Sequence, residues 1–316
     1  MSIFLTTLNQ MAFLFSLILL GFFLTKKGLL PQTAAGNLSK LETYIFIPAL
    51  VLKTFIDNFT VEKIRSASSI FLVSFVMILI IMPIAILASK ACSKDKYIQN
   101  IYTYGLAFSN FGFMGNAVVS SLFPDIFFEY LIFTLPLWIF IYLWGVPVLL
   151  RYEAGQKQSL KARLQAFVNP MFICMLVGMI VGLSQITLPV WVTSAATSCS
   201  NCMSPVAMLL TGITVASADL KKIFTNTSIY AVTFIRLILF PLVTMFLFYF
   251  LKPSETLTIC AISSVAMPLG LNTIVIPSAY GKDTTVAAGM AIISHLLSCL
   301  TIPVIFTIMT FVFGLN

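Results

Sequence analysis

Long apolar runs separated by short polar segments fill almost the whole chain. Ten of them can be distinguished, at 8–25, 41–56, 67–89, 98–122, 129–150, 167–185, 190–214, 227–251, 256–279 and 284–313. A helix that crosses a lipid bilayer needs about 20 predominantly apolar residues. The pattern therefore predicts an all-α polytopic membrane protein with ten transmembrane helices and short connections.

The composition excludes several other classes of protein. Of the 316 residues, 59% are hydrophobic and 9% are charged, whereas about 25% of a soluble domain is charged. So few charges cannot cover the surface of a soluble enzyme or a nucleic-acid binder. The high hydrophobic fraction also excludes a disordered chain. The net charge of +8 comes from Lys and Arg between the apolar runs rather than from one basic patch.

The distribution of positive charge predicts the orientation. If the N-terminus lies outside, thirteen Lys and Arg fall in inner connections, four fall in outer connections, and Arg236 falls inside an apolar run. Inner loops of membrane proteins carry the excess of positive charge. We therefore expect a multi-pass protein of the plasma membrane with both termini outside and a cytoplasmic linker at 151–166.

The two halves of the chain share features at one spacing. Gly112 and Asp125 recur as Gly270 and Asp283, 158 residues later, and Pro48 recurs as Pro205 at a spacing of 157. Five spans in each half is an odd number, so the second half must be inverted relative to the first. We expect one five-helix repeat at 1–150 and an inverted one at 167–316, as in many secondary transporters.

Polar and helix-breaking residues interrupt the fourth and ninth runs at matching places. The fourth run holds Asn110, Gly112, Gly115 and Asn116, and the ninth holds Pro268 and Asn272. Such residues in mid-membrane must face protein or water. We expect two broken helices that cross, whose half-helix N-termini bind an anion. The alternative is close helix packing through small and amide residues.

Two further ionisable residues lie within apolar runs. Arg236 is about eleven residues into the eighth run, which is ~16 Å along a helix. It is interpreted either as an attractor for a carboxylate substrate or as an Arg bonded to helix carbonyls. His295, the only His, is interpreted either as a proton-coupling group or as a neutral His bonded to a neighbouring helix.

No Asp or Glu is expected in the core of a span, and this disfavours sodium coupling. Cys199 and Cys202 form a lone CxxC without a second ligand pair, so no metal site and no cofactor are expected.

Several short motifs resemble, in their order along the whole chain, the auxin efflux carrier family, the PIN-like carriers of plants and their bacterial relatives. They are Phe46–Leu50 with Pro48, the run from Asn110 to Gly115, Ser204–Ala207 with Pro205, and Pro268 followed by Tyr280–Asp283. In this resemblance Asn110 matches the crossover Asn and Pro268 the crossover Pro, while Pro48 and Pro205 mark helix breaks in the scaffold. Plant members carry Pro soon after the Gly of span four, where this chain has Asn116-Ala117, and many have a long central loop. The chain is thus similar to a short, bacterial-type member.

The resemblance implies a crossover of spans four and nine, a scaffold of spans one, two, six and seven, and a homodimer formed through that scaffold. It also implies an organic anion as substrate, either an auxin-like acid or a dicarboxylate such as malate or malonate.

We therefore expect a secondary transporter for a small organic anion that works by alternating access and is not an enzyme. The expected partners are that anion and membrane lipid, and no nucleic acid. Alternatives are a non-transporting receptor or channel on the same fold, and an intramembrane enzyme.

Overall fold

The structure is a computed structural model that describes residues 3–31, 33–150, 170–217 and 224–315. The described residues are almost entirely helical and contain no β-strand beyond one isolated bridge. The prediction of an all-α membrane protein is confirmed in this coarse form. The expected linker at 151–166 lies outside the described residues.

Helices occupy the apolar runs of the first half. The elements there are α1 (Ile3–Lys26), α2 (Ala34–Leu41), η1 (Glu42–Phe46), α3 (Ile47–Asn58), α4 (Val61–Ser66), α5 (Ser68–Cys92), α6 (Lys96–Ala107), η2 (Phe111–Gly115), α7 (Asn116–Leu122), η3 (Pro124–Ile126), α8 (Phe127–Phe140), η4 (Ile141–Gly145) and α9 (Val146–Leu150).

Helices also occupy the apolar runs of the second half. They are α11 (Pro170–Ser184), α12 (Val190–Ser217), α14 (Thr227–Phe234), η5 (Ile235–Leu239), α15 (Phe240–Leu251), α16 (Glu255–Ala266), α17 (Asn272–Ala279) and α18 (Thr285–Phe313).

Within the described residues, six helices are long and apolar enough to cross a membrane unaided. They are Phe4–Lys26, Ser68–Cys92, Pro124–Leu150, Val190–Ser217, Thr227–Leu251 and Thr285–Phe313. Three shorter apolar helices are Phe111–Leu122, Pro170–Ser184 and Glu255–Ala266. A multi-pass membrane protein follows from these helices, whereas ten spans and an inverted repeat stay predictions.

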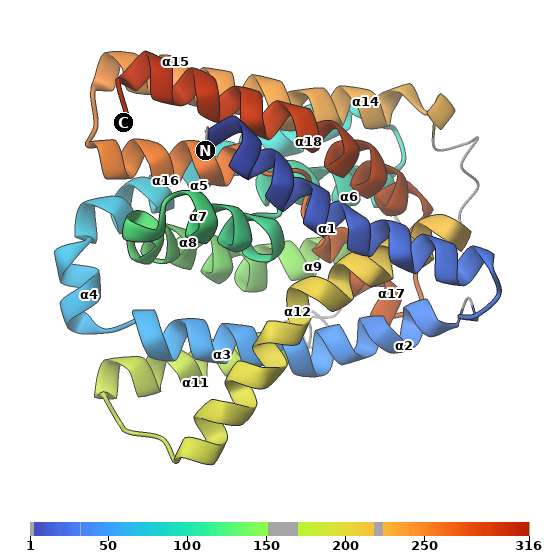
Figure 1. Ribbon diagram of the computed structural model, residues 1–316, viewed down its shortest axis with the longest axis horizontal. Coiled ribbons are helices and arrows are strands. Elements are labelled where there is room, and N and C mark those ends of the chain that lie inside the picture. The colour runs from blue at the N-terminus through green and yellow to red at the C-terminus, as the bar shows by residue number, and fades with distance from the viewer. Residues whose placement is uncertain (1–2, 32, 151–169, 218–223, 316) are drawn as a thin grey trace.

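The helices pack in two groups. One group contains α1, α3, α11 and α12, and the other contains α5 to α9 and α14 to α18. In Figure 1, α3 and α11 run along one edge of the molecule and α15 and α18 along the opposite edge. The groups meet where α1 contacts α7 and α18, where α12 contacts α18, where α3 contacts α8, and where α2, which packs on α12, contacts α17.

Glycine permits the close contact between α1 and α12. A Cβ added at Gly21 would collide with the backbone carbonyl of Leu209, and one at Gly212 with that of Ile18. Small residues let the backbones of membrane helices approach closely, which gains van der Waals contact where no hydrophobic effect operates.

Among the described residues, four helical paths contain a π-helical turn, namely η1, η2, η4 and η5. Pro48 lies in the first turn of α3, directly after η1, and the helical path continues from Ala34 to Asn58, so the helix break expected at Pro48 is wrong. The helix break expected at Pro205 is wrong, because α12 continues from Val190 to Ser217. A helix can absorb a proline by giving up a hydrogen bond and bending.

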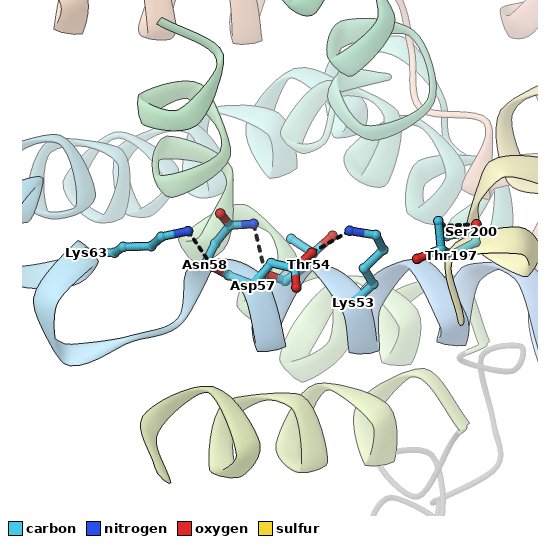
Figure 2. Close-up of polar contacts among 7 residues, drawn as sticks. All are labelled: Lys53, Thr54, Asp57, Asn58, Lys63, Thr197 and Ser200. Carbon is cyan, nitrogen blue, oxygen red and sulfur yellow. Dashed lines mark hydrogen bonds and ion pairs between the residues drawn. The ribbon is translucent and has the colours of Figure 1, made fainter. Parts of the chain in front are cut away.

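Polar contacts follow the second half of α3, and one of them connects its end to α4. Lys53 pairs with Asp57, and Lys63 Nζ donates to the backbone carbonyl of Asp57 at 2.6 Å. Asn58 Nδ2 donates to the Thr54 carbonyl at 3.0 Å. Figure 2 shows these contacts following one another along α3. They cap a helix end and fix the direction in which the chain leaves it.

Candidate functional site

The helical path is interrupted in the fourth and ninth apolar runs, and the two interruptions touch. The first lies between α6 and η2, and the second between α16 and α17. Ser109 and Leu269 form an antiparallel bridge, and the backbone N–H of Asn110 donates to the Pro268 carbonyl at 2.8 Å. Backbone groups that leave a helix in a membrane must find partners in protein, and here each interruption supplies them for the other.

Local sequence explains why the chain leaves the helix here. Pro268 has no amide hydrogen to continue a helix. A Cβ on Gly270 would stand 2.8 Å from the carbonyl oxygen of Phe108, so only glycine allows this approach. Ser109 Oγ adds a hydrogen bond to the Ser264 carbonyl at 2.7 Å.

Arg236, on η5, binds both interrupted helices. The residue is 2% exposed. It donates three hydrogen bonds to backbone carbonyls, from Nε to Met267 at 3.2 Å, from Nη1 to Leu106 at 2.9 Å and from Nη2 to Ser264 at 3.1 Å. Leu106 lies in the last turn of α6 and Ser264 in the last turn of α16. The structure thus shows the carbonyl-bonded arrangement that was one of the two interpretations of Arg236.

This placement has an electrostatic consequence. The C-terminal end of a helix carries about −0.5 of an elementary charge. Two such ends sum to roughly one negative charge, which a single guanidinium balances. The cost of burying Arg236 is therefore offset by oriented backbone dipoles rather than by a carboxylate.

Asn110 and His295 are hydrogen-bonded to each other. Asn110 Nδ2 lies 2.8 Å from His295 Nε2, and His295 Nδ1 lies 2.8 Å from the Ala291 carbonyl oxygen. A carbonyl only accepts, so Nδ1 carries the proton and Nε2 accepts from the amide. This geometry describes a neutral imidazole that orients Asn110, with Asn110 Oδ1 lacking a partner among the described residues.

Asn272 begins α17 with a similar arrangement. Its Nδ2 donates to the Tyr104 hydroxyl at 2.9 Å, and its Oδ1 has no partner within the described parts of the chain. Both interruptions thus present one buried asparagine with an unused oxygen. Buried polar atoms are nearly always satisfied, so these two acceptors are available to bind a ligand or water; of the two residues, Asn272 lines a small cavity.

A small cavity lies beside the bridge. It is about 10 Å³, which is roughly the space of one water molecule. Its lining comes from both interruptions and from α6, α8 and η4, through Tyr104, Ser109, Phe111, Gly112, Phe113, Trp138, Ile141, Gly270, Leu271 and Asn272. The starts of η2 and α17 therefore border the cavity.

The structure brings together most of the site residues expected from sequence. Gly112 and Asn272 line the cavity, and Asn110 and Pro268 are joined by a backbone hydrogen bond next to the bridge. Arg236 binds the Met267 carbonyl, which directly precedes Pro268. Two predicted residues lie farther along the chain. Gly115 packs against the Tyr130 hydroxyl, and Asn116 begins α7 with its Oδ1 unpartnered among the described residues.

Sequence reasoning missed other residues of the site. Tyr104 and Trp138 gave no signal, because aromatic residues are common in apolar runs. Trp138 packs edge-on against Phe111, with ring centroids 5.0 Å apart.

Sequence reasoning also did not single out Glu42. Glu42 is fully buried at the start of the second apolar run. Its position at the boundary of that run gave no indication in the sequence that it would be buried.

Comparison with known proteins identifies the class. The family model of membrane transport proteins matches residues 6–306, nearly the whole chain. The chain belongs to this family, and the resemblance to the auxin efflux carriers is confirmed. A comparison with curated proteins finds no match.

Proposed function

We propose that this protein is a secondary carrier for a small organic anion, and that the anion binds where the two interrupted helices meet. The observation that carries the proposal is the placement of Arg236. Its charge balances the carbonyl ends of α6 and α16. The N-terminal ends of η2 and α17, which border the cavity, are then left with roughly +0.5 each.

The charge at the two helix N-termini indicates the charge of the substrate. Two uncompensated N-termini supply about one positive charge, and N-termini bind carboxylates through free backbone amides. A single negative charge matches the site best, as in an auxin-like monocarboxylate or a dicarboxylate with one carboxyl neutralised. In this proposal Asn110 and Asn272 orient the ligand, and His295 orients Asn110.

The cavity of about 10 Å³ cannot hold an organic acid. We therefore take the structure as a closed conformation, and binding requires Trp138 or the helices around it to move. The contact of α2 with α17 and of α1 with α7 and α18 is the surface along which one group of helices would shift against the other. Alternating access by such a shift needs no enzymatic step.

The membrane arrangement follows from the same proposal. The ten apolar runs would form two inverted five-helix repeats in the plasma membrane, with both termini outside. Membrane lipid would cover the exposed apolar side chains, and a homodimer would form through α1, α3, α11 and α12. Impermeant thiol labelling of Lys157→Cys in a cysteine-free background tests the topology, because labelling in intact cells contradicts a cytoplasmic linker.

Purified protein tests the function. A thermal-shift screen of organic acids should find stabilising ligands, and the same acids should show saturable counterflow in liposomes. Stabilisation without flux would indicate a receptor, non-saturable flux a channel, and chemical conversion of the added acid an enzyme. Any of these three results would reject the carrier.

A further inference from the structure

Glu42 carries a buried carboxyl group without a hydrogen-bond or ion-pair partner among the described residues. It lies in the π-helical turn η1 and is 0% exposed. Neither carboxylate oxygen has a hydrogen-bond partner among the described residues, and the same holds for the neighbouring Thr43 Oγ1. π-Helical turns inside α-helices are rare and are found frequently at functional sites.

The missing partners determine the state of the carboxyl. An ionised carboxylate without a partner is prohibitively costly in a low-dielectric interior, so such a group takes up a proton instead. Glu42 is thus held in the neutral form in this closed conformation.

No neighbouring charge changes this conclusion. The elements packed against η1 are α2, α3, α11, α12 and α17. The titratable groups on or next to these elements and η1 are Lys40, Tyr44, Lys53, Asp57, Cys174, Cys199, Cys202 and Tyr280. Lys40 is exposed and Lys53 pairs with Asp57. No hydrogen bond or ion pair joins Glu42 to any of these groups in the described structure.

The position of Glu42 connects it with the candidate site. One turn earlier, Ser39 Oγ donates to the Val275 carbonyl of α17. α17 is the half-helix that begins at Asn272 beside the cavity. Residues of η1 also contact α17 directly. A shift of α17 along α2 and η1 would therefore change the surroundings of Glu42.

We propose that Glu42 binds and releases one proton in each transport cycle and so couples anion movement to a proton gradient. The O–H bond forms when the carboxyl meets water on one side of the membrane and breaks when it meets water on the other side, with no electron transfer. The proposal rests on the proposed carrier function. Sodium is the alternative coupling ion, and the transport experiment distinguishes it from the proton.

The test uses the full-length protein in liposomes with radiolabelled malonate as the probe and the membrane potential clamped to zero. One proton per anion gives about tenfold accumulation for each pH unit of gradient. Glu42→Gln should abolish this accumulation and retain malonate counterflow, because the amide stays neutral. The exposed Glu62 provides the matched control, and Glu62→Gln should behave as wild type. Protein-free liposomes correct for passive leak.

Accumulation by Glu42→Gln that equals wild type would overturn the proposal, and so would accumulation driven by a sodium gradient instead of a pH gradient. If wild type shows no malonate counterflow, the carrier proposal fails for this probe and the proton site is tested separately. Infrared spectroscopy of wild type at neutral pH should show a protonated carboxyl band that Glu42→Gln lacks. An unchanged band pattern would reject the proton site by itself.

Discussion

Arg236 and Glu42 occupy similar places and have opposite surroundings. Both lie in π-helical turns, and both are almost completely inaccessible to solvent. Arg236 gives three hydrogen bonds to carbonyls, whereas Glu42 has no partner in the described part of the chain. A buried charge that is fully bonded stabilises one arrangement of its neighbours. A buried acid that is not bonded must change its protonation state whenever water reaches it.

The largest effect is expected at Arg236. Arg236→Gln leaves carbonyls of α6 and α16 without a donor, at about 1–3 kcal/mol for each. We expect a loss on the order of 3–5 kcal/mol in the free energy of unfolding, measured as a lower melting temperature in detergent. Arg236→Lys should recover part of it, because the charge returns without the planar fork. If Arg236→Gln were as stable as the wild type, Arg236 would not hold α6 and α16 together.

Arg236 also allows a test of the electrostatic argument. On samples of Arg236→Gln that remain folded, the affinity for an organic anion should fall more than the affinity for a neutral analogue of similar size, and Arg236→Lys should show a smaller selective loss because it keeps the charge. An equal loss for both ligands would mean that the guanidinium acts through helix packing alone.

The next effect is expected at the bridge that Arg236 holds. In Gly270→Ala the new Cβ meets the Phe108 carbonyl at 2.8 Å, and the backbone there cannot move freely. Overpacking of this kind costs about 1–3 kcal/mol and should strongly reduce counterflow. Gly36→Ala is the matched control, since nothing lies within 4 Å of its Cβ. Equal transport by the two variants would remove the bridge from the mechanism.

The hydrogen bonding of Asn110 is intermediate between that of Arg236 and that of Glu42. Its side-chain Nδ2 is hydrogen-bonded to His295, and its Oδ1 has no partner among the described residues. Asn110→Ala should weaken ligand binding by about 1–3 kcal/mol, or roughly 5- to 150-fold. The protein should still be monodisperse by size-exclusion chromatography. A large drop in melting temperature with unchanged affinity would instead assign Asn110 to helix packing.

Glu42→Gln should have the opposite sign to Arg236→Gln. Keeping a Glu protonated costs about 1.4 kcal/mol for every pH unit above the range in which the unfolded chain releases the proton. The wild type pays this cost at neutral pH and the amide does not. The melting temperature of Glu42→Gln minus that of wild type should therefore increase from pH 5 to pH 8. A constant difference over this range would show that Glu42 is ionised in the folded protein.

The smallest effect is expected at the exposed ion pair of Figure 2, which gives the baseline for the comparison. The side chains of Lys53 and Asp57 are 37% and 45% exposed. Exposed pairs on one helix contribute about 0.3–0.5 kcal/mol. Lys53→Ala should change the melting temperature by little, and less in high salt. A loss comparable to that of Arg236→Gln would show that this end of α3 is shielded from water.

The sequence by itself determined the helices and the places where two of them stop. Apolar runs of membrane length have few alternatives, since a backbone in lipid must satisfy its own hydrogen bonds. Gly, Asn and Pro at 108–116 and 267–272 act locally, so their effect is readable without tertiary contacts. Pro205 shows the limit of this reasoning, because its helix continues unbroken.

Only the tertiary structure decided which groups meet. The partners of Arg236 are carbonyls at positions 106, 264 and 267, and backbone carbonyls have no signature in a sequence. The turn that holds Glu42 packs against α11, α12 and α17, which lie more than 120 residues away in the sequence, as well as against its neighbours α2 and α3. The sequence shows which side chains can carry a charge, but their surroundings come from elements that are distant in the sequence. That environment separates an Arg that holds two helices together from a Glu that is poised to exchange a proton.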